Sequence, residues 1–115
     1  MHAVRTERIG RVGVVNASGE LDAFAAPDLE TAFADIRDLD RVLADLGGVS
    51  FMDSTALGML VRLVRELGEA EVAVRVVLPR GTASRIFEIT MLDRVLPVAQ
   101  DAASALGDLG AYSEA

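Results

Sequence analysis

The chain opens with two short segments of β-strand pattern. Residues 4–9 alternate poorly between apolar and polar side chains, whereas residues 12–16 carry valine at 12, 14 and 15. Gly10 lies between the two segments, and glycine suits the tight turn of a β-hairpin. We therefore predict an antiparallel pair of strands, followed by a polar loop over residues 18–22 in which only Leu21 is buried.

Two longer segments carry apolar side chains at helical spacing. The first begins at Pro27, which suits the first turn of a helix, and is expected to run to about Leu39. The second begins at Asp53 and Ser54 and is expected to end at Gly68, because glycine commonly terminates helices. Their inward positions are Leu29, Phe33 and Ile36 in the first helix, and Leu57, Leu60, Val61, Val64 and Leu67 in the second.

Two shorter helices are expected later in the chain. Thr82 can cap one of them, and Asp101 can cap an alanine-rich helix that runs to about Leu109. The inward positions of the Thr82 helix are expected to be Ile86, Phe87 and Ile89. Residues 111–115 are expected to fray, as chain ends commonly do.

The segments between these helices have the composition of buried strands. Residues 41–46 precede a glycine pair, 47–48, that permits a turn, and residues 72–78 contain a single charge, which favours a central strand. A last strand is expected at 94–98. Single helices between strands imply right-handed parallel crossovers. We predict one α/β domain over residues 1–115, with a core at about 4–110. Its mixed sheet would be mostly parallel with an antiparallel N-terminal edge, and about four helices would pack on it.

Composition and charge narrow the functional class. The chain has 115 residues, 51% of them hydrophobic, and contains no cysteine, which excludes disulfides and cysteine-based zinc sites. Its net charge of −7 disfavours binding to nucleic acids and to anionic membranes. No apolar stretch is long enough to span a bilayer, and residues 1–10 lack the apolar core of a secretion signal. We therefore expect a cytoplasmic protein.

Groups suited to catalysis are sparse. His2 is the only histidine and lies in a terminus expected to be mobile, so a serine hydrolase would lack its base. Metal-ligand clusters and phosphate-binding glycine loops are absent from the sequence. Glu20 and Asp22 are better explained as a solvated loop than as a catalytic pair. These observations predict a protein without enzymatic activity, metal or cofactor.

A polar triplet, Asp53-Ser54-Thr55, stands at the start of the second long helix. A hydroxyl at this place can cap the helix, which contributes about 1 kcal/mol. It can also accept a phosphoryl group, because a phosphate there meets unpaired N–H groups and the positive end of the helix dipole. Such a phosphate would change the surface charge without unfolding the helix. Spacing alone leaves both roles of Ser54 open.

Three motifs in order resemble the STAS domain of bacterial anti-sigma factor antagonists, over about residues 4–110. The first is Gly19-Glu20-Leu21-Asp22. The second and most specific lies within residues 45–63 and comprises Asp45-Leu46, Val49, Phe51 to Thr55 and Leu57-Gly58. The third is Leu92-Asp93-Arg94-Val95 followed by Pro97-Val98.

The resemblance implies a partner switch controlled by phosphorylation. Ser54 would be phosphorylated by an anti-sigma factor with serine kinase activity, and a metal-dependent serine phosphatase would reset it. The unphosphorylated chain would bind that anti-sigma factor and free the sigma factor. Asp53 would position the acceptor or cap the helix, and Asp22 would form a salt bridge to a partner arginine. Thr55 is a secondary candidate acceptor.

Two positions depart from the family's pattern, in which glycine is common at both. Ala56 predicts a stiffer and bulkier first helical turn, which would alter how closely a kinase backbone approaches. Met91 stands near the end of the third helix, and because methionine resists positive φ, we expect that helix to end differently.

Two alternative functions stay open at this point. A non-switching STAS module, either a scaffold or a transporter-associated subunit, would have the same fold. A hydrolase that uses Ser54 is the third hypothesis, and the lack of a base argues against it.

Overall fold

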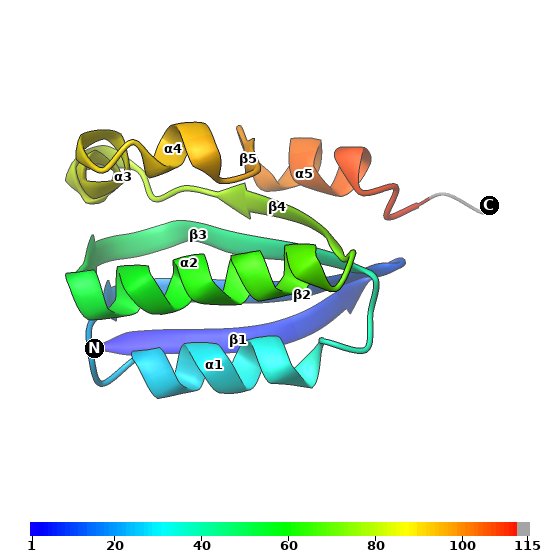
Figure 1. Cartoon of the computed structure of the whole chain (residues 1–115), viewed down its shortest axis with the longest axis horizontal. Helices are drawn as coiled ribbons and strands as arrows, with labels where there is room; N and C mark the ends of the chain where they lie inside the picture. Colours follow the sequence, from blue (N-terminus) through cyan, green and yellow to red (C-terminus); the bar gives the residue numbers. More distant parts are fainter. Residues whose placement is uncertain (113–115) are drawn as a thin grey trace.

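The computed structural model describes residues 1–112, which form a five-stranded sheet with helices on both faces (Figure 1). The strands lie side by side in chain order: β1 His2–Ile9, β2 Val12–Leu21, β3 Arg41–Met52, β4 Ala73–Val77 and β5 Val98–Ala99. The helices are α1 Ala26–Asp35, α2 Ser54–Glu69, α3 Arg85–Ile89, α4 Leu92–Val95 and α5 Ala102–Asp108, with a 3-10 turn at Gly81–Ser84.

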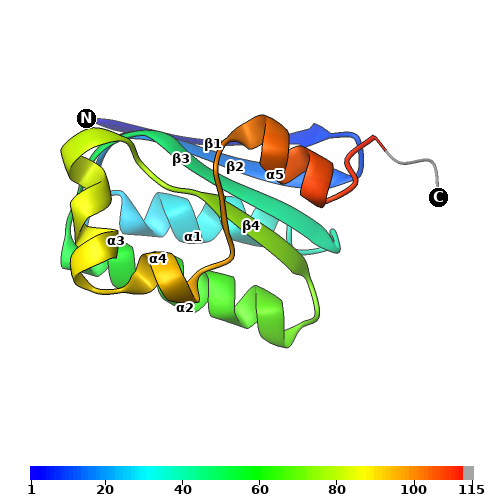
Figure 2. The same cartoon turned by 90° about the horizontal axis from the view of Figure 1, so that it is seen from above.

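The sheet topology confirms the predicted mixed architecture. β1 is antiparallel to β2, and every later pair of neighbouring strands is parallel. Figures 1 and 2 together show α1 and α2 on one face of the sheet and α5 on the other. Because side chains alternate along a strand, β3 directs Val42 and Ala44 into the core under α1 and α2, and Leu43 into the smaller core under α5.

β2 and β3 are both longer than predicted. Residues 18–21 form the end of β2 rather than a loop, although Leu21 is fully buried as expected. The glycine pair 47–48 lies inside β3 and makes no turn. A Cβ on Gly48 would lie 3.1 Å from the Cβ of Ser18 on β2, so glycine here permits close approach of two strands. As a result, β3 runs unbroken to Met52 and leads directly into α2.

The two long helices end at positions other than those predicted. α1 stops at Asp35, and Ile36 after it stays buried. Acidic side chains at 35 and 38 oppose the negative end of the helix dipole, which favours this early end. α2 continues past Gly68 to Glu69. Its buried stripe includes Leu63, whereas Val61 is only half-buried.

The segment after β4 differs most from the prediction. Thr82 caps no helix, and Ile89 is 80% exposed rather than inward-facing, although Phe87 is fully buried. Residues 92–95 form α4, whereas a strand was predicted over residues 94–98, so the described part of the chain has five α-helices rather than four.

Met91 is the residue that separates α3 from α4. Its backbone adopts the left-handed conformation, with φ 60° and ψ 16°. The expectation that methionine would avoid positive φ was therefore wrong. Met91 takes the conformation that glycine would take, at a cost of about 1–2 kcal/mol for a residue with a side chain.

The C-terminal helix agrees with the prediction. Asp101 caps α5 by accepting a hydrogen bond from the Ser104 backbone N–H at 2.8 Å. Ala111 is buried, and its carbonyl accepts a hydrogen bond from the Arg11 backbone N–H at 3.1 Å, so the chain is still packed there. Residues 113–115, for which fraying was also predicted, lie outside the described residues.

Candidate functional site

The carboxyl ends of β2 and β3 bring two of the sequence motifs together. Leu21 and Met52 are partners in the parallel register. Just beyond them, the Asp53 backbone N–H donates to the Leu21 carbonyl at 3.0 Å. Asp22 and Asp53, the first residues after the two strands, therefore lie side by side at one edge of the sheet, the edge formed by the carboxyl ends of the parallel strands. Binding sites of parallel α/β folds commonly form at this edge.

Asp53 is the N-cap of α2. Its backbone is extended, with φ −92° and ψ 175°, and its Oδ1 accepts a hydrogen bond from the Ala56 backbone N–H at 2.9 Å. Its carbonyl accepts the next hydrogen bond, from the Leu57 N–H at 3.0 Å. This confirms the capping role considered for Asp53. The alternative, in which the hydroxyl of Ser54 caps the helix, is wrong.

Ser54 is the first residue of α2 and its side chain is exposed, as is that of Thr55. Within residues 1–112, the Ser54 hydroxyl makes no hydrogen bond to the protein. The backbone N–H groups of Ser54 and Thr55 have no acceptor within the helix, because the first turn of any helix lacks them. The site therefore combines an accessible hydroxyl, unpaired N–H donors and the positive end of the dipole of a 16-residue helix.

Asp22 holds the loop between β2 and α1. Its Oδ1 accepts hydrogen bonds from the backbone N–H groups of Phe24, at 3.0 Å, and Ala25, at 3.2 Å. Its carbonyl accepts two more, from the N–H groups of Ala25 and Ala26. Sequence reasoning anticipated a contact of Asp22 with a partner and missed this role within the chain. The signal was the aspartate two residues before the loop tip, where such side chains commonly bond to the following backbone.

Ala56 is fully buried beneath the first turn of α2. Its methyl group therefore lies out of reach of a partner's backbone. The residue stays close to the site through its N–H, which binds the Asp53 carboxylate. The consequence of alanine at this position is a filled core, and not a bulkier surface.

The histidine lies in an ordered strand rather than in a mobile terminus. His2 is part of β1, and its Nε2 lies 2.7 Å from Oδ2 of Asp28 in the first turn of α1. Within residues 1–112, no base is hydrogen-bonded to Ser54, and no cluster of three or more potential metal ligands is found. Over the same residues, none of the helices is long and apolar enough to cross a membrane.

Comparisons with known proteins agree with this geometry. The family model for the STAS domain matches residues 3–105. The anti-sigma-B factor antagonist of Staphylococcus aureus is 34% identical over 86 residues, which are 73% of this chain and 80% of the relative. The corresponding protein of Staphylococcus epidermidis is 31% identical over the same shares.

Solved structures give the same result. An anti-sigma factor antagonist from Mycobacterium paratuberculosis is 31% identical and superposes with a TM-score of 0.84 over 95% of this chain and 94% of its own. The Bacillus cell fate determinant SpoIIAA, in its phosphorylated form, is 21% identical with a TM-score of 0.69 over 92% of this chain and 98% of its own, which shows the fold alone. The chain thus belongs to the STAS-domain family of anti-sigma factor antagonists.

Proposed function

We propose that this chain is a partner switch in which Ser54 carries the phosphate. The unphosphorylated form would bind an anti-sigma factor and release a sigma factor, and phosphorylation would abolish that binding. One observation carries the proposal. Asp53 performs the capping of α2, which leaves the Ser54 hydroxyl exposed and without a hydrogen bond at a helix start.

The chemistry of the transfer divides between the two proteins. A bond forms between Ser54 Oγ and the γ-phosphorus of ATP, ADP leaves, and the hydroxyl proton passes to a base. That base would come from the anti-sigma factor acting as a serine kinase, because the Ser54 hydroxyl has no hydrogen-bonded base among residues 1–112. A metal-dependent serine phosphatase would hydrolyse the phosphoserine and return the chain to its binding form.

Local electrostatics explain how the phosphate would act. The N–H groups at the start of α2 stabilise a phosphate, so the helix would stay folded. The carboxylates of Asp22 and Asp53 lie at the same edge of the sheet, and the phosphate would add nearly two further negative charges there. A partner surface that fits the neutral hydroxyl would then face an uncompensated charge, whose burial is strongly unfavourable.

The remaining elements of the proposal follow from this mechanism. The whole chain, residues 1–115, would be one STAS domain, without direct contact to nucleic acid or membranes. It would act in the cytoplasm, where ATP and sigma factors are found. Thr55, the second residue of the helix and also exposed, is the alternative acceptor.

Phosphorylation mapped by mass spectrometry tests the proposal. Each ATP-binding anti-sigma factor of the source organism would be purified and incubated with the chain and Mg-ATP, in parallel with the Ser54→Ala and Thr55→Ala variants. The proposal predicts one phosphate on Ser54 from one of these kinases, lost in Ser54→Ala and retained in Thr55→Ala. Phosphate on Thr55 alone, or none from any of the kinases, contradicts it.

A further inference from the structure

Aromatic side chains are few, and half of the phenylalanines are on the surface. The chain has four phenylalanines, one tyrosine and no tryptophan. Phe33 and Phe87 lie in the core with 3% and 0% of their surface exposed, whereas Phe24 and Phe51 are 86% and 51% exposed. Both exposed phenylalanines lie at the end of the molecule that bears Ser54. Phe51 is the penultimate residue of β3, and Phe24 is in the loop before α1.

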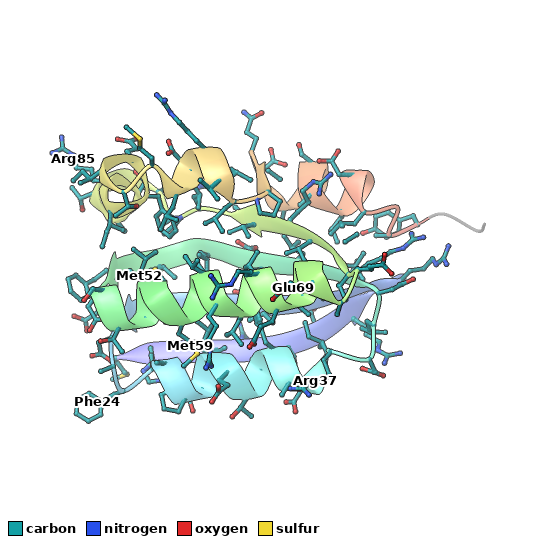
Figure 3. All side chains as sticks on the ribbon, viewed as in Figure 1. Phe24, Arg37, Met52, Met59, Glu69 and Arg85 are labelled. Carbon is teal, nitrogen blue, oxygen red and sulfur yellow. The ribbon has the colours of Figure 1, made fainter. Side chains whose placement is uncertain are left out.

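Phe24 projects away from the protein. Figure 3 shows its ring beyond the start of α1, at the same end of the molecule as Met52 of β3. A phenylalanine that is 86% exposed gains almost nothing from burial within its own chain. Exposed apolar side chains mark binding surfaces when they are grouped, and Phe51 is a second exposed phenylalanine at this end of the molecule.

The backbone under Phe24 is held in place. The Asp22 carboxylate accepts hydrogen bonds from the N–H groups of Phe24 and Ala25. The Asp22 carbonyl also accepts a hydrogen bond from the Ala25 N–H, so the loop is closed by both groups of Asp22. An aromatic ring on a pre-ordered loop loses little conformational entropy when it binds. Aromatic residues in such settings are the usual anchors of protein interfaces.

Phe24 lies close enough to Ser54 for one partner to cover both. The hydrogen bond between Asp53 and Leu21 joins the two segments, and Phe24 is three residues beyond Leu21. Summing Cα spacings limits the separation of Phe24 and Ser54 to about 20 Å. A standard interface of about 800 Å² per partner is roughly 30 Å across, so both residues fit within it.

We propose that Phe24 is the affinity anchor for the anti-sigma factor and that Asp22 is its positioning residue, an inference that rests on the function proposed above. The site on the anti-sigma factor would be an apolar pocket next to the surface that contacts Ser54. The position of Phe24 supports this choice, because the Asp53–Leu21 hydrogen bond keeps it within about 20 Å of Ser54, so a partner that covers Ser54 also reaches Phe24. Anchor and switch are then separate groups: Phe24 supplies affinity, and Ser54 controls whether the surface can be covered.

Calorimetric titration of each ATP-binding anti-sigma factor of the source organism, with ADP bound, tests the anchor. The Phe24→Ala variant should weaken binding by at least about 30-fold. Tyr112→Ala is the matched control, since Tyr112 is an aromatic residue 75% exposed at the C-terminal end, and its affinity should stay within about threefold of wild type. Melting temperatures of both variants should equal that of the wild type. The KM for Ser54 phosphorylation should rise in Phe24→Ala while kcat is retained.

The outcomes separate this inference from the function on which it rests. If Ser54 is phosphorylated but Phe24→Ala binds within about threefold of wild type, the anchor is wrong and the switch stands. An equal loss in Tyr112→Ala also overturns the anchor. If the chain binds tightly and is never phosphorylated, the switch is wrong, and a loss specific to Phe24→Ala still supports the anchor. A wild-type chain that binds no anti-sigma factor contradicts both.

Discussion

The starts of α2 and α5 are built in the same way and lie in different surroundings. In each, an aspartate in extended conformation accepts a hydrogen bond from the N–H three residues later: Asp53 at 2.9 Å and Asp101 at 2.8 Å. The next residue is Ser54 in α2 and Ala102 in α5. α2 is 16 residues long and begins beside the Asp22 loop, whereas α5 has seven residues and lies on the other face of the sheet (Figure 2).

The comparison shows that a capped helix start is not in itself a functional site. Both aspartates do the same structural work, and only one is followed by a hydroxyl. That hydroxyl is available for chemistry because the aspartate, and not the serine, makes the capping bond. The surroundings add the second difference, since only α2 begins beside the loop that presents Phe24.

Moving the acceptor should produce the largest effect. In the double variant Ser54→Ala with Ala102→Ser, the Asp-Ser helix start is recreated at α5 and removed from α2. We expect phosphorylation at position 102 to be at least about 100-fold slower than at Ser54 in the wild type, because the kinase would be misplaced on that face. Quantitative mass spectrometry of both positions measures the ratio. Comparable labelling would show that any capped helix start suffices and would remove the distinction between the two regions.

Changing Asp22 should have a smaller effect than moving the acceptor, and it should act on binding of the anti-sigma factor. Asp22→Ala removes both carboxylate hydrogen bonds of the loop and should weaken binding of the anti-sigma factor about tenfold. Asp22→Asn keeps an oxygen acceptor and loses only the charge, so it should retain most of the affinity. Calorimetry on the two variants measures the difference. Equal losses would instead favour the salt bridge to a partner arginine that the family resemblance implies.

Removing the caps should lower stability by a modest amount. Asp53→Ala should cost about 1 kcal/mol of unfolding free energy and lower the melting temperature by roughly 5 °C. Asp101→Ala should cost less, because α5 is the shorter helix. Thermal unfolding followed by circular dichroism measures both, with Asp53→Asn as a control that keeps a good capping side chain. An unchanged melting temperature in Asp53→Ala would mean that Asp53 does not cap α2 in solution.

Acid should weaken the α5 cap by the smallest amount. The hydrogen bond from the Ser104 N–H holds the pKa of Asp101 below its ordinary value of 3.8. The pKa of Asp101 is lower in the folded state than in the unfolded chain. The ionised Asp101 therefore stabilises the fold above pH 3.8, and this contribution is lost as the pH falls through the folded-state pKa. The melting-temperature difference between wild type and Asp101→Asn should therefore shrink as the pH is lowered from 5 to below 3.8. A difference that stays constant over this range would rule out a charged cap at Asp101.

The order of the major elements could be predicted because the spacing of apolar residues and the positions of glycine, proline and capping residues agree along most of the chain. The apolar stripe of α2 and the aspartate at its start fixed both the helix and the candidate acceptor. The identity of the capping residue could not be predicted, because aspartate and serine cap helices almost equally well and a shift of one residue exchanges their roles. The exposure of Phe24 was equally hidden, since it depends on the angle at which the Asp22 loop leaves the sheet.

The wrong predictions about the fold have similar causes. Gly48 permits a turn, but it also permits the close approach of β2 and β3 that the structure contains. Only the pairing of the two strands decides between a turn and a continuous strand. The four residues of α4 are too few for periodicity to distinguish a helix from a strand. Met91 adopts positive φ between α3 and α4, where its N–H donates to the Glu88 carbonyl and its carbonyl accepts from the Arg94 N–H, and these two hydrogen bonds help to offset its local preference.

Phosphorylation of Ser54 as an off-switch is the central claim, and the affinities of the two forms test it most directly. The chain phosphorylated only on Ser54 and the unphosphorylated chain would each be titrated into the same ADP-bound anti-sigma factor by calorimetry. The account predicts nanomolar to micromolar binding of the unphosphorylated chain and binding at least about 30-fold weaker for the phosphorylated one. Equal affinities of the two forms would contradict it.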